Sequence, residues 1–158
     1  MSANLDLQVD EPFAGEIQPD QLERALTLTL SRFHPQLDQP TITLVITDNE
    51  TVQQLNWQYR GLDTPTDVLS FVNVPDSEFP GSDDAHLGDI VIAYPVARAQ
   101  ADAGGHPPMA ELILLAVHGA LHLLGFEHDT PAEKHKMWSA QQEIMVELGL
   151  GYIQPTEN

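Results

Sequence analysis

Three histidines lie close together at the end of an apolar run, at positions 118, 122 and 128. If residues 118–124 are helical, His118 and His122 are four residues apart, and their rings lie one above the other on one helix face. Gly125 can adopt the left-handed conformation that ends a helix, which returns His128 toward the other two rings. Three neutral imidazoles with an open fourth direction form a catalytic zinc site, whereas a lone histidine in such a helix is usually a core residue. The three together therefore predict a metal site at His118, His122 and His128.

The spacing of these histidines is that of the metzincin protease pattern H-E-x-x-H-x-x-G-x-x-H, with one departure. Gly119 stands where the protease has a glutamate. Because that glutamate is the general base of the zinc proteases, we do not expect a metzincin protease.

Three acids are candidates for work around such a metal. Glu127 and Asp129 flank His128, and each is placed to act as a general base or to orient a ligand imidazole. Glu111 is the one charged residue of the helix expected around His118, and it shares a stripe with His118 and His122. It is a candidate for a hydrogen bond that orients a ligand imidazole. A capping role near the helix start is an equally good interpretation.

The composition limits the classes of function. The 158 residues include 24 acids, 6 bases and no cysteine, with a formal net charge of −18. A metal must therefore use nitrogen or oxygen ligands, and a broad basic face for nucleic-acid phosphates is excluded. Contact with a nucleic acid would be local, through a metal and one or two arginines. The acidic surface also suits a basic protein partner, although solubility alone is the simpler explanation of the charge.

The length predicts one domain over residues 1–158, with a frayed polar tail at 151–158. The amino terminus lacks the pattern of a signal peptide, and the longest apolar run is about 13 residues where a membrane helix needs about 20. We therefore expect a cytoplasmic protein with no membrane partner.

Hydrophobic periodicity and breakers predict the elements that must position the histidines. Strands are expected at residues 4–9, 41–47, 67–72 and 88–94, with the last two antiparallel, and loops at 11–18, 60–66 and 73–87, the last of them mobile. Helices are expected at residues 20–33, 47–59, 95–103, 107–124 and 131–148. Capping boxes at Thr47 and Thr130 mark two helix starts. The helix at 107–124 is apolar almost all round, which predicts a central, buried position. Trp57 and Trp138 could stack on nucleobases, but core packing is the simpler interpretation of both.

Three blocks of the chain carry a family resemblance, at residues 55–71, 87–92 and 118–128. With these blocks the sequence resembles the YbeY family of bacterial rRNA maturation factors and endoribonucleases. Two positions depart from the family pattern: Glu127 stands where Asp is common, and Val72 stands where a proline often follows the Ser-Phe pair.

The resemblance implies a single-domain α+β fold, with a mixed four-stranded sheet, about five helices and a central buried helix that carries the ligand histidines. It implies one zinc ion per chain at His118, His122 and His128, and a functional role for Arg60. It also implies metal-dependent cleavage of single-stranded RNA in rRNA processing, including the 3′ end of 16S rRNA, and in ribosome quality control. The expected partners are rRNA and a basic ribosomal protein or the small ribosomal subunit, with no DNA.

Arg60 would hold the scissile phosphate through its planar guanidinium. The alternative for Arg60 is an ion pair with Asp63 or Asp67 that only fixes the loop. Two other functions stay open at this point: a metallohydrolase acting on another substrate, and a non-enzymatic ribosome assembly factor in which zinc is structural.

Overall fold

The sheet has four strands and mixed polarity, as expected. The computed structural model describes residues 4–36, 39–73 and 86–153. The strands are β1 (Asn4–Val9), β2 (Thr41–Thr47), β3 (Val68–Val72) and β4 (His86–Ala93), in the spatial order β1-β2-β4-β3. Strands β1, β2 and β4 are parallel, and β3 is antiparallel to β4. Both the mixed sheet and the antiparallel last pair are confirmed.

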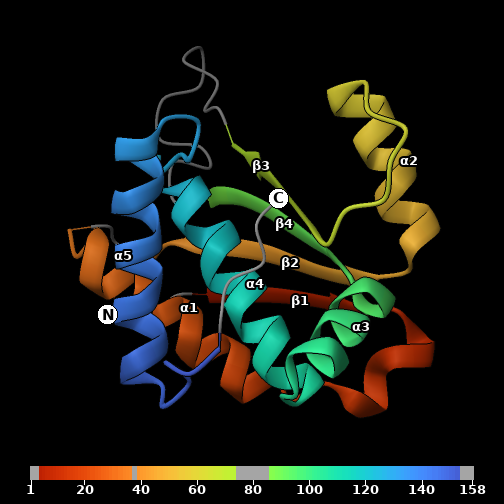
Figure 1. Cartoon of the computed structure of the whole chain (residues 1–158), viewed down its shortest axis with the longest axis horizontal. Helices are drawn as coiled ribbons and strands as arrows, with labels where there is room; N and C mark the ends of the chain where they lie inside the picture. The colour runs from red at the N-terminus through yellow and green to blue at the C-terminus, as the bar shows by residue number, and fades with distance from the viewer. Residues whose placement is uncertain (1–3, 37–38, 74–85, 154–158) are drawn as a thin grey trace.

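Within the described residues, five α-helices pack around this sheet, which confirms the predicted α+β class (Figure 1). They are α1 (Pro19–Phe33), α2 (Asn49–Arg60), α3 (Tyr94–Gly104), α4 (Pro108–Leu123) and α5 (Pro131–Glu147). The segment at residues 11–18, expected to be a loop, contains the 3₁₀ helix η1 (Glu11–Glu16), with a proline in its first turn. Proline is compatible with a first turn because its missing N–H has no partner there anyway.

The start of α2 differs from the prediction by one residue. Asp48, not Thr47, is the N-cap, and its carboxylate accepts a hydrogen bond from the backbone N–H of Thr51 at 2.7 Å. The Thr47 hydroxyl instead donates to the carboxylate of Asp10 at 2.6 Å. The predicted cap of α5 is confirmed, since Thr130 accepts from the Glu133 N–H at 3.1 Å.

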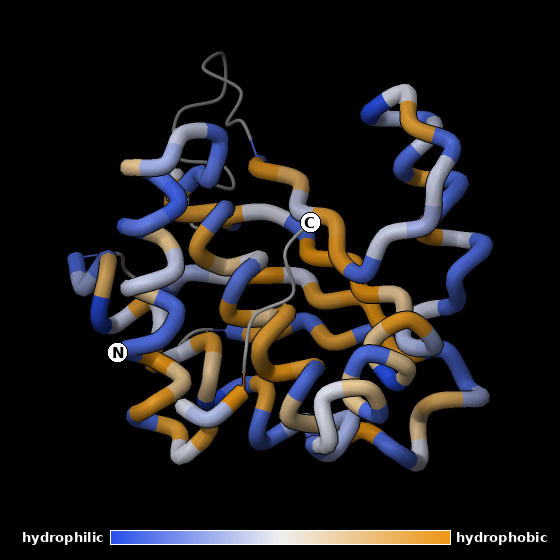
Figure 2. Tube along the Cα trace, viewed as in Figure 1, coloured by the Kyte–Doolittle hydropathy of each residue, from blue (hydrophilic) through white to orange (hydrophobic). Residues whose placement is uncertain are grey.

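The two faces of the sheet are covered by different helices because strand side chains alternate between faces. On β4, Ile90 and Ile92 belong to the main core with α1, α4 and α5. Val91 and Ala93 belong to a smaller cluster on the other face, which includes Val52 of α2. Helix α4 lies between α5 and α3 in Figure 1, and it is mostly hydrophobic in Figure 2. Twelve of its residues are buried, which confirms the predicted central helix.

Several predictions about the ends of segments meet the limits of the described residues. Of the mobile loop predicted at 73–87, residues 74–85 lie outside them, and His86 and Leu87 belong to β4. Of the frayed tail predicted at 151–158, residues 154–158 lie outside them, and Ile153 is only 2% exposed, so fraying does not begin at 151.

Trp57 is 60% exposed, so the prediction that it packs in the core is wrong. In the described part of the chain, no helix has the length and hydrophobicity needed to span a membrane.

Gly88 of β4 lies where α4 presses closely on the sheet. Its φ is +149°, and a Cβ added there would lie 2.2 Å from the carbonyl oxygen of Phe71 and 2.8 Å from a methyl group of Leu123, the last residue of α4. The position therefore requires glycine for both its backbone conformation and its space.

We expect Gly88→Ala to lower the free energy of unfolding by roughly 2–4 kcal/mol, because backbone strain and overpacking add at this site. Urea denaturation followed by circular dichroism measures the change. Gly15→Ala is the matched control, since an added Cβ there meets nothing within 4 Å. A loss at Gly88 no larger than that at Gly15 would contradict this account of the α4 contact.

Candidate metal centre

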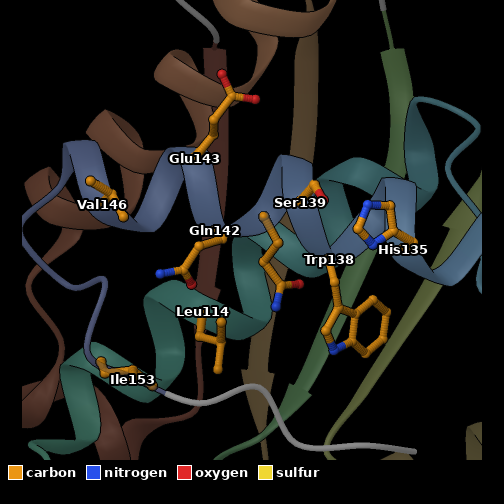
Figure 3. Close-up of a pocket in the computed structure, with 9 residues that line it drawn as sticks. Leu114, His135, Trp138, Ser139, Gln142, Glu143, Val146 and Ile153 are labelled. Atoms are coloured by element: carbon orange, nitrogen blue, oxygen red, sulfur yellow. The ribbon is translucent and has the colours of Figure 1, made fainter.

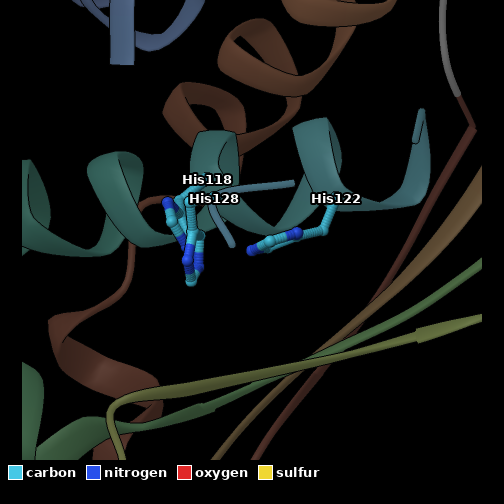
Figure 4. Close-up of side chains that lie close together, drawn as sticks. All are labelled: His118, His122 and His128. Carbon is cyan, nitrogen blue, oxygen red and sulfur yellow. The ribbon is translucent and has the colours of Figure 1, made fainter. Parts of the chain in front are cut away.

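Helix α4 and the turn after it bring the three predicted histidines together. Gly125 follows α4 with φ +99°, in the left-handed region, and the Phe126 N–H bonds back to the carbonyl oxygen of Leu121 at 3.0 Å. This turn returns His128 to the helix face that carries His118 and His122 (Figure 4). One ligand atom from each of the three rings lies within 4.8 Å of the others. The structure therefore forms the cluster that the spacing predicts.

Two of the rings are oriented by hydrogen bonds from their Nδ1 atoms. Nδ1 of His118 lies 2.9 Å from Oε1 of Gln141, and Nδ1 of His122 lies 2.9 Å from the carbonyl oxygen of Phe126. Because both partners are oxygen acceptors, Nδ1 carries the proton and donates in each ring. The lone pair therefore sits on Nε2, which is the arrangement that a ligand histidine needs.

Burial keeps these two imidazoles neutral. Desolvation is the main cause that lowers the pKa of His118 from 6.5 to about 4, with repulsion from His122 second. Desolvation also lowers the pKa of His122, although the nearby Glu127 acts in the opposite direction. Neutral rings bind cations without first losing a proton, so the electrostatics of the cluster favour a metal at neutral pH.

Gly119 faces the sheet and not the cluster. A Cβ at this position would lie 2.8 Å from Cγ2 of Ile90 and 3.1 Å from Oγ of Ser70. The Ser70 hydroxyl also donates a hydrogen bond to the Gly119 carbonyl oxygen at 3.4 Å. A glutamate here would enter the helix–sheet interface, which gives a steric reason for the departure from the protease pattern.

Arg60 is the last residue of α2 and is exposed. It lies close enough to His122 for its positive charge to contribute to the lowering of that pKa. In the described part of the chain, neither Asp63 nor Asp67 pairs with it: Gln53 donates to Asp63 at 3.0 Å, and Gln100 donates to Asp67 at 3.2 Å. The loop-fixing ion pair considered for Arg60 is therefore absent from this structure.

The three candidate acids occupy different places. Glu127 has its carboxylate 3.6 Å from Nδ1 of His122 and a half-exposed side chain. Asp129 is exposed and makes no hydrogen bond or ion pair to the three histidines within residues 86–153. Glu111 is buried, and its carboxylate contacts Nε2 of His106 at 2.7 Å. Burial raises the pKa of Glu111, with the His106 contact opposing this effect.

Glu111 lies seven residues before His118, which places it about 10 Å further along α4. The groups that hold the ligand rings from behind are Gln141 and the Phe126 carbonyl, neither of which was singled out in the sequence. A signal for Gln141 was present. It falls on the apolar stripe of α5 with Met137, Ile144 and Met145, and a polar residue on a buried stripe needs a partner.

Trp138 of α5 is a further neighbour of the cluster. Its ring centroid lies 5.6 Å from that of His118 and 5.5 Å from that of His128, nearly perpendicular to both. The ammonium group of Lys134, one turn earlier, lies 5.5 Å from the Trp138 ring. Sequence reasoning considered this tryptophan but did not connect it with the histidines.

Comparison with known proteins identifies the family. The family model described as Endoribonuclease YbeY matches residues 10–149. A protein of Roseiflexus sp. (strain RS-1) named Endoribonuclease YbeY is 42% identical over 151 residues, covering 92% of this chain and 93% of the relative. A protein of the same name from Brevibacillus brevis is 43% identical over 126 residues, covering 71% of this chain and 77% of the relative.

The solution structure of TM1509 from Thermotoga maritima has a similar fold. It aligns with a TM-score of 0.54 at 21% identity, covering 93% of this chain and 91% of that one. This likeness supports the fold, and the family model and the relatives show that the chain belongs to the Endoribonuclease YbeY family.

Proposed function

We propose that this chain is a metal-dependent endoribonuclease that cleaves single-stranded RNA during rRNA maturation. The observation that carries this proposal is the convergence of three histidine nitrogens, two of them on rings whose Nδ1 is hydrogen-bonded to an oxygen, close enough to Arg60 for its charge to act on His122. The relatives are named endoribonucleases, which supports RNA as the substrate.

The donor set fits zinc. Three neutral imidazoles suit zinc as well as nickel or copper, and availability decides among these metals. A structural zinc site is usually closed by four protein ligands. The cluster offers only three ligand residues among residues 4–36, 39–73 and 86–153, which leaves one position for water or substrate. This open position favours a catalytic site over a zinc that only stabilises the fold.

Each residue near the histidines has a role in this proposal. When bound, zinc supplies Lewis acidity and a water of lowered pKa. Gln141 and the Phe126 carbonyl hold His118 and His122 by Nδ1, so that Nε2 of each ring would be free to bind zinc. Arg60 binds a nonbridging oxygen of the scissile phosphate through charge-assisted hydrogen bonds. Glu127, whose carboxylate lies 3.6 Å from Nδ1 of His122, is our candidate for helping the Phe126 carbonyl to hold that ring, and the general base stays unassigned.

The remaining expectations form part of the same proposal. Processing of rRNA, including the 3′ end of 16S rRNA, requires contact with the small ribosomal subunit or a basic ribosomal protein, and the charge of −18 suits a basic partner. Such work takes place in the cytoplasm. A single domain over residues 1–158 stays a prediction.

We expect His122→Ala to lose the bound metal and RNA cleavage together. Removing a group that only orients a metal ligand lowers metal affinity or activity about 10–100-fold. Removing the ligand itself should therefore lower the rate of cleavage by more than about a hundredfold. Elemental analysis of the purified protein and cleavage of a single-stranded RNA measure the two losses. His34→Ala is the matched control, and chelator followed by added zinc should abolish and restore wild-type cleavage. A metal-free His122→Ala protein that cleaves at the wild-type rate would refute the proposal.

We expect Arg60→Ala to retain the metal and to lower kcat/KM for RNA by roughly a hundredfold to a thousandfold, as loss of a transition-state donor does. Arg60→Lys should recover part of this activity because it keeps the charge without the planar fork. Arg98→Ala, which removes an exposed arginine of α3, is the control. Equal kcat/KM values for the Ala variants at positions 60 and 98 would remove Arg60 from the site.

The low pKa of His118 predicts a pH dependence of stability in the metal-free protein. The unfolded chain binds a proton at this residue near pH 6.5, whereas the folded chain binds it only near pH 4. This contribution is therefore complete above pH 6.5 and lost as the pH falls from 6.5 to 4, and it is on the order of 3 kcal/mol. Urea denaturation of wild type and His118→Gln at pH 7, 5.5 and 4.5 should show a difference that narrows toward low pH. Parallel pH profiles would contradict the shift.

A further inference from the structure

A groove lies on the surface between α4 and α5 (Figure 3). Its volume is about 610 Å³. Most of its lining comes from α5, with one residue from α4 and one from the segment after α5: Leu114, His135, Trp138, Ser139, Gln141, Gln142, Glu143, Val146 and Ile153. None of the residues proposed to bind the metal or the scissile phosphate lines it, so the groove is a separate part of the surface.

Two residues connect this groove with the histidines. Gln141 lines the groove and also accepts the hydrogen bond that orients His118. Trp138 lines the groove, and its ring also contacts the rings of His118 and His128. Trp138 is therefore the part of the groove whose ring lies beside the histidine cluster.

The lining has the chemistry that a nucleobase requires. Trp138 packs against the core with part of its surface and is partly exposed, whereas Met137 before it is fully buried, so part of the indole remains accessible. An aromatic face binds any base by stacking, and this contact is worth about 1–3 kcal/mol. His135 and Ser139 are exposed polar side chains at the same end of α5 and offer hydrogen bonds to the edge of a base.

The charge at this end of the groove also fits an RNA strand. The ammonium group of Lys134 lies 5.5 Å from the centre of the Trp138 ring. The acid in the lining, Glu143, is paired with Arg32 of α1 at 3.1 Å. The groove at Trp138 therefore combines an aromatic ring with a nearby ammonium group, which suits an anionic strand with a stacked base.

We propose that Trp138 and the adjoining end of the groove bind the nucleobase next to the scissile phosphate. This assignment rests on the proposed ribonuclease function and adds a base-binding subsite to it. A base stacked on Trp138 must leave the stack of its own strand, so the subsite admits single-stranded RNA and rejects a paired base. It reads no particular base through the stacking contact, because every base has an aromatic face.

The test compares enzyme variants with RNAs that lack one base. The cut linkage in a single-stranded oligoribonucleotide is mapped first, and an abasic ribose is then placed on its 5′ side or its 3′ side. Trp138→Leu should raise KM on the intact RNA about tenfold or more, with kcat little changed and metal content equal to wild type. Trp138→Phe should recover most of the loss. Trp57→Leu, which removes the other tryptophan, is the matched control and should behave as wild type.

On one of the two abasic RNAs, wild type and Trp138→Leu should have the same KM, because the base that distinguishes them is missing. A KM difference that persists on both abasic RNAs, or a Trp138→Leu protein that loses metal in proportion to activity, would overturn the subsite and leave Trp138 a wall of the metal centre. If the wild-type protein cuts no RNA, both the proposed function and the subsite are refuted. If the wild-type protein cuts RNA and Trp138→Leu has the same KM, only the subsite is refuted.

A second measurement covers the case in which Trp138→Leu does not fold. Trp57→Phe leaves Trp138 as the only tryptophan, since the chain has two. Its fluorescence should be quenched on mixing with single-stranded RNA and should stay unchanged with the same sequence as a duplex. Unchanged fluorescence with both RNAs would contradict stacking.

Discussion

The close contact between α4 and the β3–β4 pair decides where the histidines point. Gly88 and Gly119 have no side chain at the points where helix and sheet meet, and Ser70 bonds to the helix carbonyl there. With this face of α4 fixed on the sheet, His118 and His122 lie off the contact, on the side toward the returning loop. The same contact excludes a glutamate after the first histidine. One packing constraint therefore sets the geometry of the metal centre and removes the protease base.

Burial then supplies the electrostatics of the centre. Helix α4 is the most buried helix of the fold, so its histidines are largely desolvated and stay neutral. Neutral rings are ambiguous in tautomer unless something fixes the proton. Gln141 of α5 and the Phe126 carbonyl do so, which means that the helix packing and the loop after α4 both contribute to ligand orientation. The candidate metal site is therefore part of the packing of the fold and not an addition to its surface.

Features that depend on residues close together in sequence were predicted more completely than features that depend on distant contacts. The helix of His118 and His122, the turn at Gly125 and the cap at Thr130 all depend on residues a few positions apart, and each is present. The parallel pairing of β1, β2 and β4 and the partner of Gln141 depend on residues far apart in sequence, which spacing does not encode. Trp57 shows that the type of a residue alone does not predict its burial, because this aromatic residue was predicted in the core and is exposed near the end of α2. Periodicity predicted the four strands, and the family resemblance predicted that they form one mixed sheet.

The distribution of the few basic residues shows how a strongly acidic chain can bind RNA. Of six bases, Arg60 acts on His122, Lys134 lies over Trp138, and Lys136 lies 5.7 Å from the Phe126 ring, next to the loop of the ligands. At physiological ionic strength the Debye length is about 8 Å, so acids elsewhere on the surface are largely screened at this point. The charge beside the histidines is therefore set by these three side chains together with Glu127, whose carboxylate lies 3.6 Å from Nδ1 of His122. The acidity of the remaining surface discourages RNA from binding elsewhere.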